Sequence, residues 1–260
     1  MFAWNIELFA ALASSFAAVL VGSGGDILFM SSVTLLGSLF LHHNQGSFYL
    51  GTWVAAQGIV ATLVGGVAYW RLVEIRSKDM GRSMAVVAAG SITGSVTAYF
   101  LPSAVLHVVL AVAITAGVGR VFLGKVEELG ACAGEAPQVG KVALFALFAT
   151  AVLTGGLGIG GGFLFLVVLA RVGLSFRQVK GFTLILTCTN LVTSFILHVS
   201  AASTSLNGVA AAVVGALAGS LLAAALIRRT NDQVAFWGLR TLLVGSAVMS
   251  WVSVGLFRFF

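Results

Sequence analysis

The sequence contains very little charge. Only 8% of its 260 residues are Asp, Glu, Lys or Arg, whereas soluble domains carry about 25%. Too few charged side chains are present to cover a surface that faces water. Hydrophobic residues make up 59% of the chain, and the longest uncharged runs are 27–70, 83–119, 142–170 and 181–227. Because a spanning helix needs roughly 20 apolar residues, the sequence predicts a multi-pass integral membrane protein whose surroundings are a lipid bilayer.

Cysteine and proline are also scarce, with two of each. Cys132 and Cys188 form no CxxC pair, so neither a disulfide framework nor a zinc site is indicated. The net charge of +6 does not indicate a nucleic-acid partner, because most basic residues lie beside the apolar runs, where they would meet lipid headgroups. The glycine-rich stretch 158–162 lacks the Gly-Lys-Ser/Thr that a nucleotide-binding loop needs. We therefore expect no cofactor, no metal and no nucleic acid.

The apolar segments are expected to be helices, because they are long and rich in Ala, Leu and Val, whereas a membrane barrel shows short alternating strands. The expected helices are 6–21, 26–41, 48–70, 83–101, 103–123, 141–157, 162–174, 178–198, 206–227 and 234–257. The charged stretch 71–82 is expected to be a loop. Glycine and proline punctuate these segments, most densely at 22–25 and 158–162.

The chain contains an internal repeat. A spacing of 136 residues aligns Gly22, Gly24 and Gly25 with glycines in 158–161, and a spacing of 125 aligns 90–95 with 215–220. Chance matches are expected in a glycine-rich apolar chain, but two matches in the same order favour a duplication. The predicted domains are a first membrane repeat at 1–124, a linker at 125–140 and a second membrane repeat at 141–260.

The distribution of basic residues orients the helices. Lys and Arg gather in 71–82, beside the 125–140 linker, in 171–180 and at 228–229, so all four regions are expected in the cytoplasm. The remaining connections lack Lys and Arg and are expected outside. The resulting trace predicts an all-α protein with two inverted repeats, each with a glycine-broken helical hairpin and three spanning helices, the arrangement of many secondary transporters.

Each glycine break separates two short segments. The segment 27–41 gives only about 22 Å of helix, against a hydrocarbon core of roughly 30 Å, so hairpins that turn near the middle of the membrane are expected. The second helix of each hairpin would begin at the turn, where its free N–H groups and positive dipole end favour an anion. The alternative is that the glycines merely allow close helix packing, as expected for the glycines in 90–94 and 215–219. The predicted substrate-binding residues at the turns are Gly22, Ser23, Gly24, Gly25, Asp26, Gly158, Ile159, Gly160, Gly161 and Gly162.

Further polar residues lie within the apolar segments. Gln57 and Asn190 are predicted to complete the hydrogen-bonding shell of the anion, whereas Thr187, Thr189, Thr193 and Ser194 are interpreted as packing residues. Lys180 is expected to extend to the inner interface. Asp26 is an intramembrane carboxyl and hence a candidate for proton coupling, the alternative being a helix cap.

Two stretches carry a family resemblance. Residues 153–164, LTGGLGIGGGFL, and 173–183, GLSFRQVKGFT, resemble the sulfite exporter TauE/SafE family, also known as toluene-sulfonate uptake permeases. The resemblance extends over nearly the whole chain in length, duplication and motif order. The chain departs from the pattern where Asp26 replaces the last glycine of the first turn, where no proline follows either turn, and where Phe182 and Leu184 interrupt a cluster of small residues. The resemblance implies transport of small anions across the cell inner membrane, such as sulfite, organosulfonates or small carboxylates.

Two other functions, a membrane scaffold or receptor and an intramembrane enzyme, fit the sequence less well. A membrane scaffold or receptor that transports nothing has no need of broken helices. An intramembrane enzyme built on Ser23 and Asp26 lacks a histidine placed to act as the base. We therefore expect a transporter and not an enzyme, with a small anion as its substrate and with the oligomeric state left open.

Overall fold

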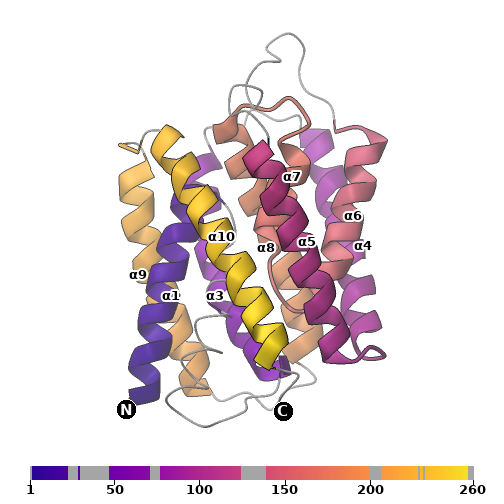
Figure 1. Cartoon of the computed structure of the whole chain (residues 1–260). Coiled ribbons are helices and arrows are strands. Elements are labelled where there is room, and N and C mark those ends of the chain that lie inside the picture. The colour runs from indigo at the N-terminus through magenta and orange to yellow at the C-terminus, as the bar shows by residue number, and fades with distance from the viewer. Residues whose placement is uncertain are drawn as a thin grey trace.

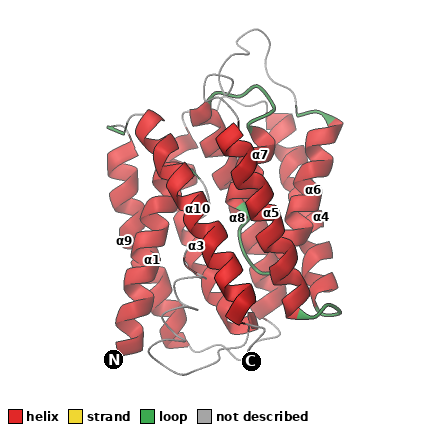
Figure 2. Ribbon diagram, in the orientation of Figure 1, coloured by secondary structure: helices red, strands yellow, loops and turns green. Residues whose placement is uncertain are grey.

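The computed structural model describes residues 2–22, 29, 47–70, 77–123, 139–199, 206–227, 229–230 and 232–256. Every secondary-structure element in these residues is a helix (Figure 2), as the sequence predicts. The helices are α1 (Phe2–Val21), α3 (Ser47–Tyr69), α4 (Ser77–Ala98), α5 (Ser103–Leu123), α6 (Lys141–Gly156), α7 (Gly162–Leu169), α8 (Phe176–Val199), α9 (Leu206–Ile227) and α10 (Asp232–Leu256).

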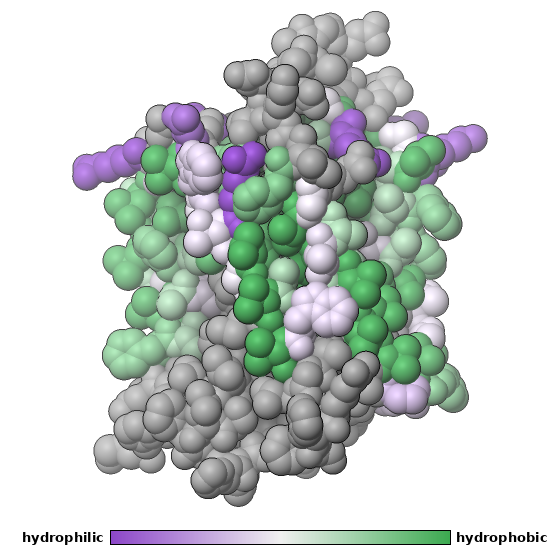
Figure 3. Space-filling view, in the orientation of Figure 1, coloured by the Kyte–Doolittle hydropathy of each residue, from purple (hydrophilic) through white to green (hydrophobic). Residues whose placement is uncertain are grey.

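The helices stand side by side in one bundle, and the start of α1 and the end of α10 lie at the same end of it (Figure 1). Hydrophobic side chains cover most of the described surface in the view of Figure 3, and hydrophilic side chains gather at the end opposite the start of α1. Three of the described helical stretches, Phe176–His198, Val209–Ile227 and Gln233–Val252, are each long and apolar enough to cross a membrane. The prediction of a helical membrane protein is confirmed.

The predicted helix limits agree with the structure apart from three places. Helix α1 begins at Phe2, before the predicted start at residue 6. The stretch 71–82 was expected to be a loop, but α4 begins at Ser77, so Lys78, Asp79 and Arg82 lie on its first turns. Asp79 favours this start because its charge complements the positive end of the helix dipole. Helix α7 ends at Leu169 instead of continuing to 174. The expected helix at 26–41 lies outside the described residues, except for Phe29.

Glycines bring α4 and α6 into close contact. A methyl group on Gly90 would lie 2.7 Å from the carbonyl oxygen of Phe148, and one on Gly94 would collide with the carbonyl of Val152. From the first contact to the second, the residue number rises by four on α4 and also by four on α6. The two helices therefore run parallel. The expectation that Gly90 and Gly94 are packing residues is confirmed.

The same arrangement recurs between α1 and α9. A methyl group on Gly215 would collide with the carbonyl of Leu8, and one on Gly219 with that of Leu12. These two helices also run parallel, because the residue numbers of the contacts rise by four on both α1 and α9. In each pair a small-residue face lets two backbones approach closely, which is how helices associate in lipid.

Helices α3 and α8 pack against each other in opposite directions. A methyl group on Gly65 would lie 3.0 Å from the side chain of Leu184, whereas Thr62, one turn earlier, bonds to Cys188, one turn later. From the first contact to the second, the residue number falls on α3 and rises on α8. The two helices are therefore antiparallel.

Helices α5 and α10 are antiparallel as well. The Trp251 indole donates to the Thr115 hydroxyl at 2.9 Å, while the Arg240 guanidinium lies 5.2 Å from the Phe122 ring centroid. Arg240 lies within an apolar span and was not among the predicted site residues. It also stacks on Phe236 at 4.6 Å, and such aromatic contacts stabilise a cation away from water.

Candidate functional site

The second glycine break ends α6 with a tight reversal. The Gly158 N–H donates to the Gly155 carbonyl at 3.1 Å, and the Ile159 N–H donates to the Thr154 carbonyl at 3.0 Å. This pair of bonds needs a left-handed residue at the first position after the cap, and Gly158 supplies it with φ of 68°. The break predicted at 158–162 is confirmed as a structural feature.

Helix α7 begins at Gly162, after the turn, and no side chain caps its start. Its N-cap residue is Gly161, which is left-handed with φ of 67°, and the first bond of the helix runs from the Phe165 N–H to the Gly161 carbonyl at 3.0 Å. The N–H groups of Gly162, Phe163 and Leu164 precede that bond and so have no partner within the helix. All these residues are buried. A buried helix start without a side-chain cap favours an anion, because the N–H groups and the helix dipole act together.

Asn190 of α8 holds the turn in place. Its Nδ2 atom lies 2.9 Å from the Ile159 carbonyl, 3.2 Å from the Gly160 carbonyl and 3.0 Å from the Thr154 hydroxyl. Because the carbonyls only accept hydrogen bonds, they fix which end of the amide faces the turn. Asn190 is fully buried, and its Oδ1 atom has no hydrogen-bond partner. The donor end of Asn190 is therefore used by the protein, and its acceptor end remains for a ligand or water.

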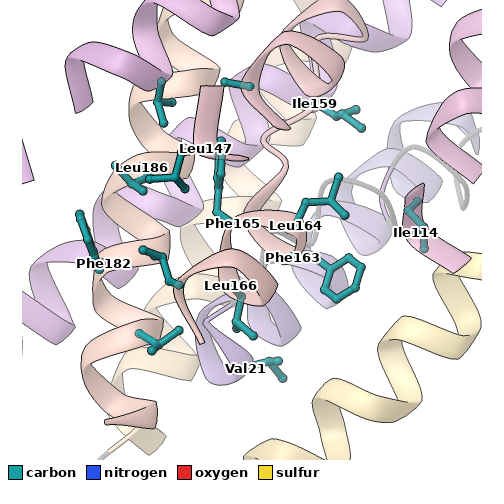
Figure 4. Close-up of a cluster of buried hydrophobic side chains, with 14 of the residues drawn as sticks. Val21, Ile114, Leu147, Ile159, Phe163, Leu164, Phe165, Leu166, Phe182 and Leu186 are labelled. Carbon is teal, nitrogen blue, oxygen red and sulfur yellow. The ribbon is translucent and has the colours of Figure 1, made fainter. Parts of the chain in front are cut away.

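Apolar side chains fix the position of α7. Phe163 and Leu164 project towards Ile114 of α5, while Phe165 lies near Leu147 and Leu186 (Figure 4). Lipid is as apolar as these side chains, so close packing rather than exclusion of water holds them. The turn thus sits on a rigid support.

Gln57 of α3 resembles Asn190 in its contacts. Its amide nitrogen bonds to the Ser15 hydroxyl of α1, as Asn190 bonds to the Thr154 hydroxyl of α6. Gln57 is also fully buried, and its Oε1 atom has no partner. One turn away on the same helix, the buried indole N–H of Trp53 has no partner either.

The first glycine break is described only at Gly22. This residue has φ of 72°, and its N–H donates to the Ala18 carbonyl at 2.8 Å. Gly22 lies directly against Lys180 of α8. The predicted residues Ser23, Gly24, Gly25 and Asp26 lie outside the described residues.

The two breaks contact α8 at different levels. Gly22 meets it at Lys180 and the second turn meets it at Asn190, ten residues further along, which is about 15 Å of helix. Gly22 and the second turn therefore contact the same helix at separate levels. The prediction that both breaks form one substrate site depends on Ser23, Gly24, Gly25 and Asp26, which lie outside the described residues.

Lys180 does not extend to the interface as expected. Only 3% of the residue is exposed, and its ammonium group lies 4.5 Å from the Phe176 ring centroid and 5.5 Å from that of Tyr69. Aromatic faces stabilise a cation withdrawn from water, so the buried position is physically reasonable. The sequence does not indicate this burial, because a lysine near the start of a helix and close to another basic residue ordinarily reaches towards headgroups.

Comparison with known families agrees with these features. The family model described as sulfite exporter TauE/SafE matches residues 7–250. No curated protein and no solved structure matched the chain. The match includes both glycine breaks and every described helix that contacts them. The chain therefore belongs to the sulfite exporter TauE/SafE family, a family of membrane transporters of sulfur-containing anions.

Proposed function

We propose that the chain is a secondary transporter of a small sulfur oxyanion, sulfite or an organosulfonate, in the cell inner membrane, and that the substrate binds at the start of α7. The observation that supports this most strongly is the buried helix start at Gly161, which no side chain caps. Backbone N–H groups left without partners are costly at membrane depth unless something satisfies them. An oxyanion with several acceptor oxygens does so without a basic residue in the turn itself.

The Asn190 oxygen narrows the choice of ligand. It accepts hydrogen bonds and is buried without a partner, and the Nδ2 atom of the same side chain bonds to the turn that precedes α7. A singly protonated oxyanion such as hydrogensulfite offers both oxygens for the N–H groups and one O–H for Asn190. A fully ionised sulfonate needs a bridging water at the same place.

We further infer that residues 1–124 and 141–260 form inverted repeats joined by the 125–140 linker. Under this duplication α1 corresponds to α6, α3 to α8, α4 to α9 and α5 to α10. A two-fold axis in the membrane plane makes each helix antiparallel to its own counterpart, whereas an axis along the membrane normal makes them parallel. The antiparallel contacts of α3 with α8 and of α5 with α10 support the inverted arrangement.

The remaining contacts support the same symmetry. Exchanging the halves converts the α1–α9 pair into the α6–α4 pair, and both pairs are parallel and joined by glycines. Transport would then proceed by one half moving against the other around the site. The termini would face outside and the linker the cytoplasm, so an impermeant thiol reagent should not label Cys132 in intact cells expressing a Cys188→Ala variant.

Asp26 is proposed to couple the anion to a proton. An ionised carboxylate beside the first turn would compete with the anion, and protonation would remove the competition. Asp26→Asn should abolish the pH dependence of anion binding and prevent accumulation driven by a proton gradient. Accumulation that persists in this variant would leave Asp26 as a helix cap.

A thermal-shift screen of the purified protein tests the binding site. Sulfite, sulfate, methanesulfonate and acetate would each be added, and a ligand that binds only the folded state at ~100 Kd adds roughly 2.7 kcal/mol of stability. We expect sulfite or the sulfonate to stabilise the wild type and to have no effect on Gly161→Ala. If no anion raises the unfolding temperature, the proposed site is wrong.

A further inference from the structure

One face of α8 carries a file of buried polar side chains. Lys180, Thr183, Thr187 and Asn190 are spaced by three, four and three residues, so they share one side of the helix. Lys180 is 3% exposed and the other three are fully buried. The file begins where Gly22 meets α8 and ends where the second turn meets it.

The two threonines differ from most of the threonines whose side chains the structure describes. Nine described threonines donate to the carbonyl four residues earlier, which is the ordinary arrangement in a helix. Thr189 and Thr193 of the same helix are among them. Thr183 and Thr187 forgo that bond, and their buried hydroxyls have no partner at all. A buried polar group without a partner is rare in native proteins and needs an explanation.

Unpartnered buried polar side-chain atoms are concentrated on two of the described helices. Five of the seven buried ones in the described residues lie on α8 or α3, which pack together. On α3 they are the Trp53 indole N–H and the Gln57 amide oxygen, and on α8 they are the two threonine hydroxyls and the Asn190 oxygen. Helix α8 follows the second broken hairpin, which α6 and α7 form, and α3 holds the corresponding place in the predicted first repeat. This concentration favours a ligand path over random packing defects.

Charge is placed at one end of this file. The Lys180 ammonium, buried against Tyr69 and Phe176, is positive, whereas the hydroxyls that follow are neutral. A buried cation attracts an anion strongly because little water screens it. Neutral hydroxyls bind the same anion more weakly and so do not trap it.

We propose that Lys180, Thr183 and Thr187 form a second anion-binding station, through which the oxyanion passes between the Lys180 end of α8 and the turn at Asn190. The proposal rests on the transport function above and adds the route. The hydroxyls of Thr183 and Thr187 donate to the oxygens of the anion in succession. Lys180 supplies the charge that draws it in.

Isosteric variants test the hydroxyls. Thr183→Val and Thr187→Val remove one hydroxyl each with little change of volume. Because neither hydroxyl has a hydrogen-bond partner within the protein, its removal should leave the unfolding temperature unchanged or raise it. Sulfite binding and uptake of labelled sulfite into proteoliposomes should weaken, by about tenfold for the double variant. Thr189→Val and Thr193→Val are the matched controls, since their hydroxyls bond within the helix, and they should bind sulfite like the wild type.

The role of the Lys180 charge is tested by two variants, one that removes the charge and one that keeps it. Lys180→Met keeps the apolar stem and should lose most sulfite uptake, whereas Lys180→Arg keeps the charge and should restore it. If the threonine double variant binds and transports sulfite like the wild type, the station is wrong while the transport function stands. If the wild type itself neither binds sulfite nor takes it up, the proposed function fails first.

Discussion

Two glycine-rich regions of this molecule use the same residue for opposite purposes. In α4, Gly90 and Gly94 are ordinary helical residues whose missing side chains admit the backbone of α6. In the second turn, Gly158 and Gly161 have positive φ and break the helix. The sequence distinguishes the two, because glycines four residues apart within a long apolar run favour packing, whereas glycines crowded between two short segments favour a turn.

The comparison separates stability from binding. A side chain added at a packing glycine pushes two helices apart, so it should reduce folding. A side chain added at a turn glycine disturbs the proposed site, so it should reduce anion binding more than folding. The following variants test that division, from the largest expected effect to the smallest.

Gly94→Ala should have the largest effect on folding. Its methyl group would meet the backbone carbonyl of Val152, which cannot rotate away, and overpacking typically costs about 1–3 kcal/mol or more. Gly81→Ala is the control on the same helix, because nothing lies within 4 Å of it, and it should stabilise by about 0.5–1 kcal/mol. The measurement is the unfolding temperature in detergent. Equal behaviour of the two variants would contradict the packing interpretation.

Gly161→Ala should lower stability less and binding more. The alanine would be held at φ of 67°, and its methyl group would lie 2.6 Å from the Thr154 side chain, with strain on the order of 1–3 kcal/mol. Sulfite should no longer raise its unfolding temperature. Gly119→Ala, with open space around it, serves as the control. A folded Gly161→Ala protein that binds sulfite normally would move the site elsewhere.

Asn190→Leu should weaken sulfite binding at a smaller cost in stability. It leaves the carbonyls of Ile159 and Gly160 without their donor, which costs about 1–3 kcal/mol, and it loosens the turn. Binding would be followed by isothermal titration with sulfite, using Thr193→Val as the control on the same helix. Unchanged affinity would mean that Asn190 only packs.

Ser95→Ala should have the smallest effect. Its hydroxyl donates to the Gly155 carbonyl at 3.0 Å and ties α4 to the end of α6, and hydrogen bonds between membrane helices average about 0.6 kcal/mol. We expect a small fall in unfolding temperature and normal sulfite affinity. A large loss of affinity would show that the packing region and the turn are coupled.

Much of the fold was accessible from sequence, because the bilayer imposes simple rules of length and polarity. Helices α5 and α9 begin and end at the predicted residues, and the break at 158–162 is where the glycine cluster indicated. The predicted start of α4 was wrong. Hydropathy marks only the edge of the apolar run, whereas a helix can continue past that edge into a charged segment.

The site was less accessible, because it depends on which helices meet. Asn190 was recognised as polar and intramembrane, but its hold on Ile159 and Gly160 required the hairpin to pack on α8. Thr187 was interpreted as a packing residue, like Thr189 and Thr193, and only the structure shows that its buried hydroxyl has no hydrogen-bond partner while theirs bond within the helix. The burial of Lys180 depends on Tyr69, more than a hundred residues away. No local pattern carries these contacts.

Uptake of labelled sulfite into proteoliposomes tests the central claim most directly. Wild type and Gly161→Ala would be reconstituted at equal density, with Gly119→Ala as the control, and compared with empty liposomes. We predict that the wild type and the control fill the vesicles with sulfite, whereas Gly161→Ala is no faster than empty liposomes although it is folded. Uptake by Gly161→Ala at the wild-type rate, or none by the wild type, would contradict transport of the anion through the second glycine turn.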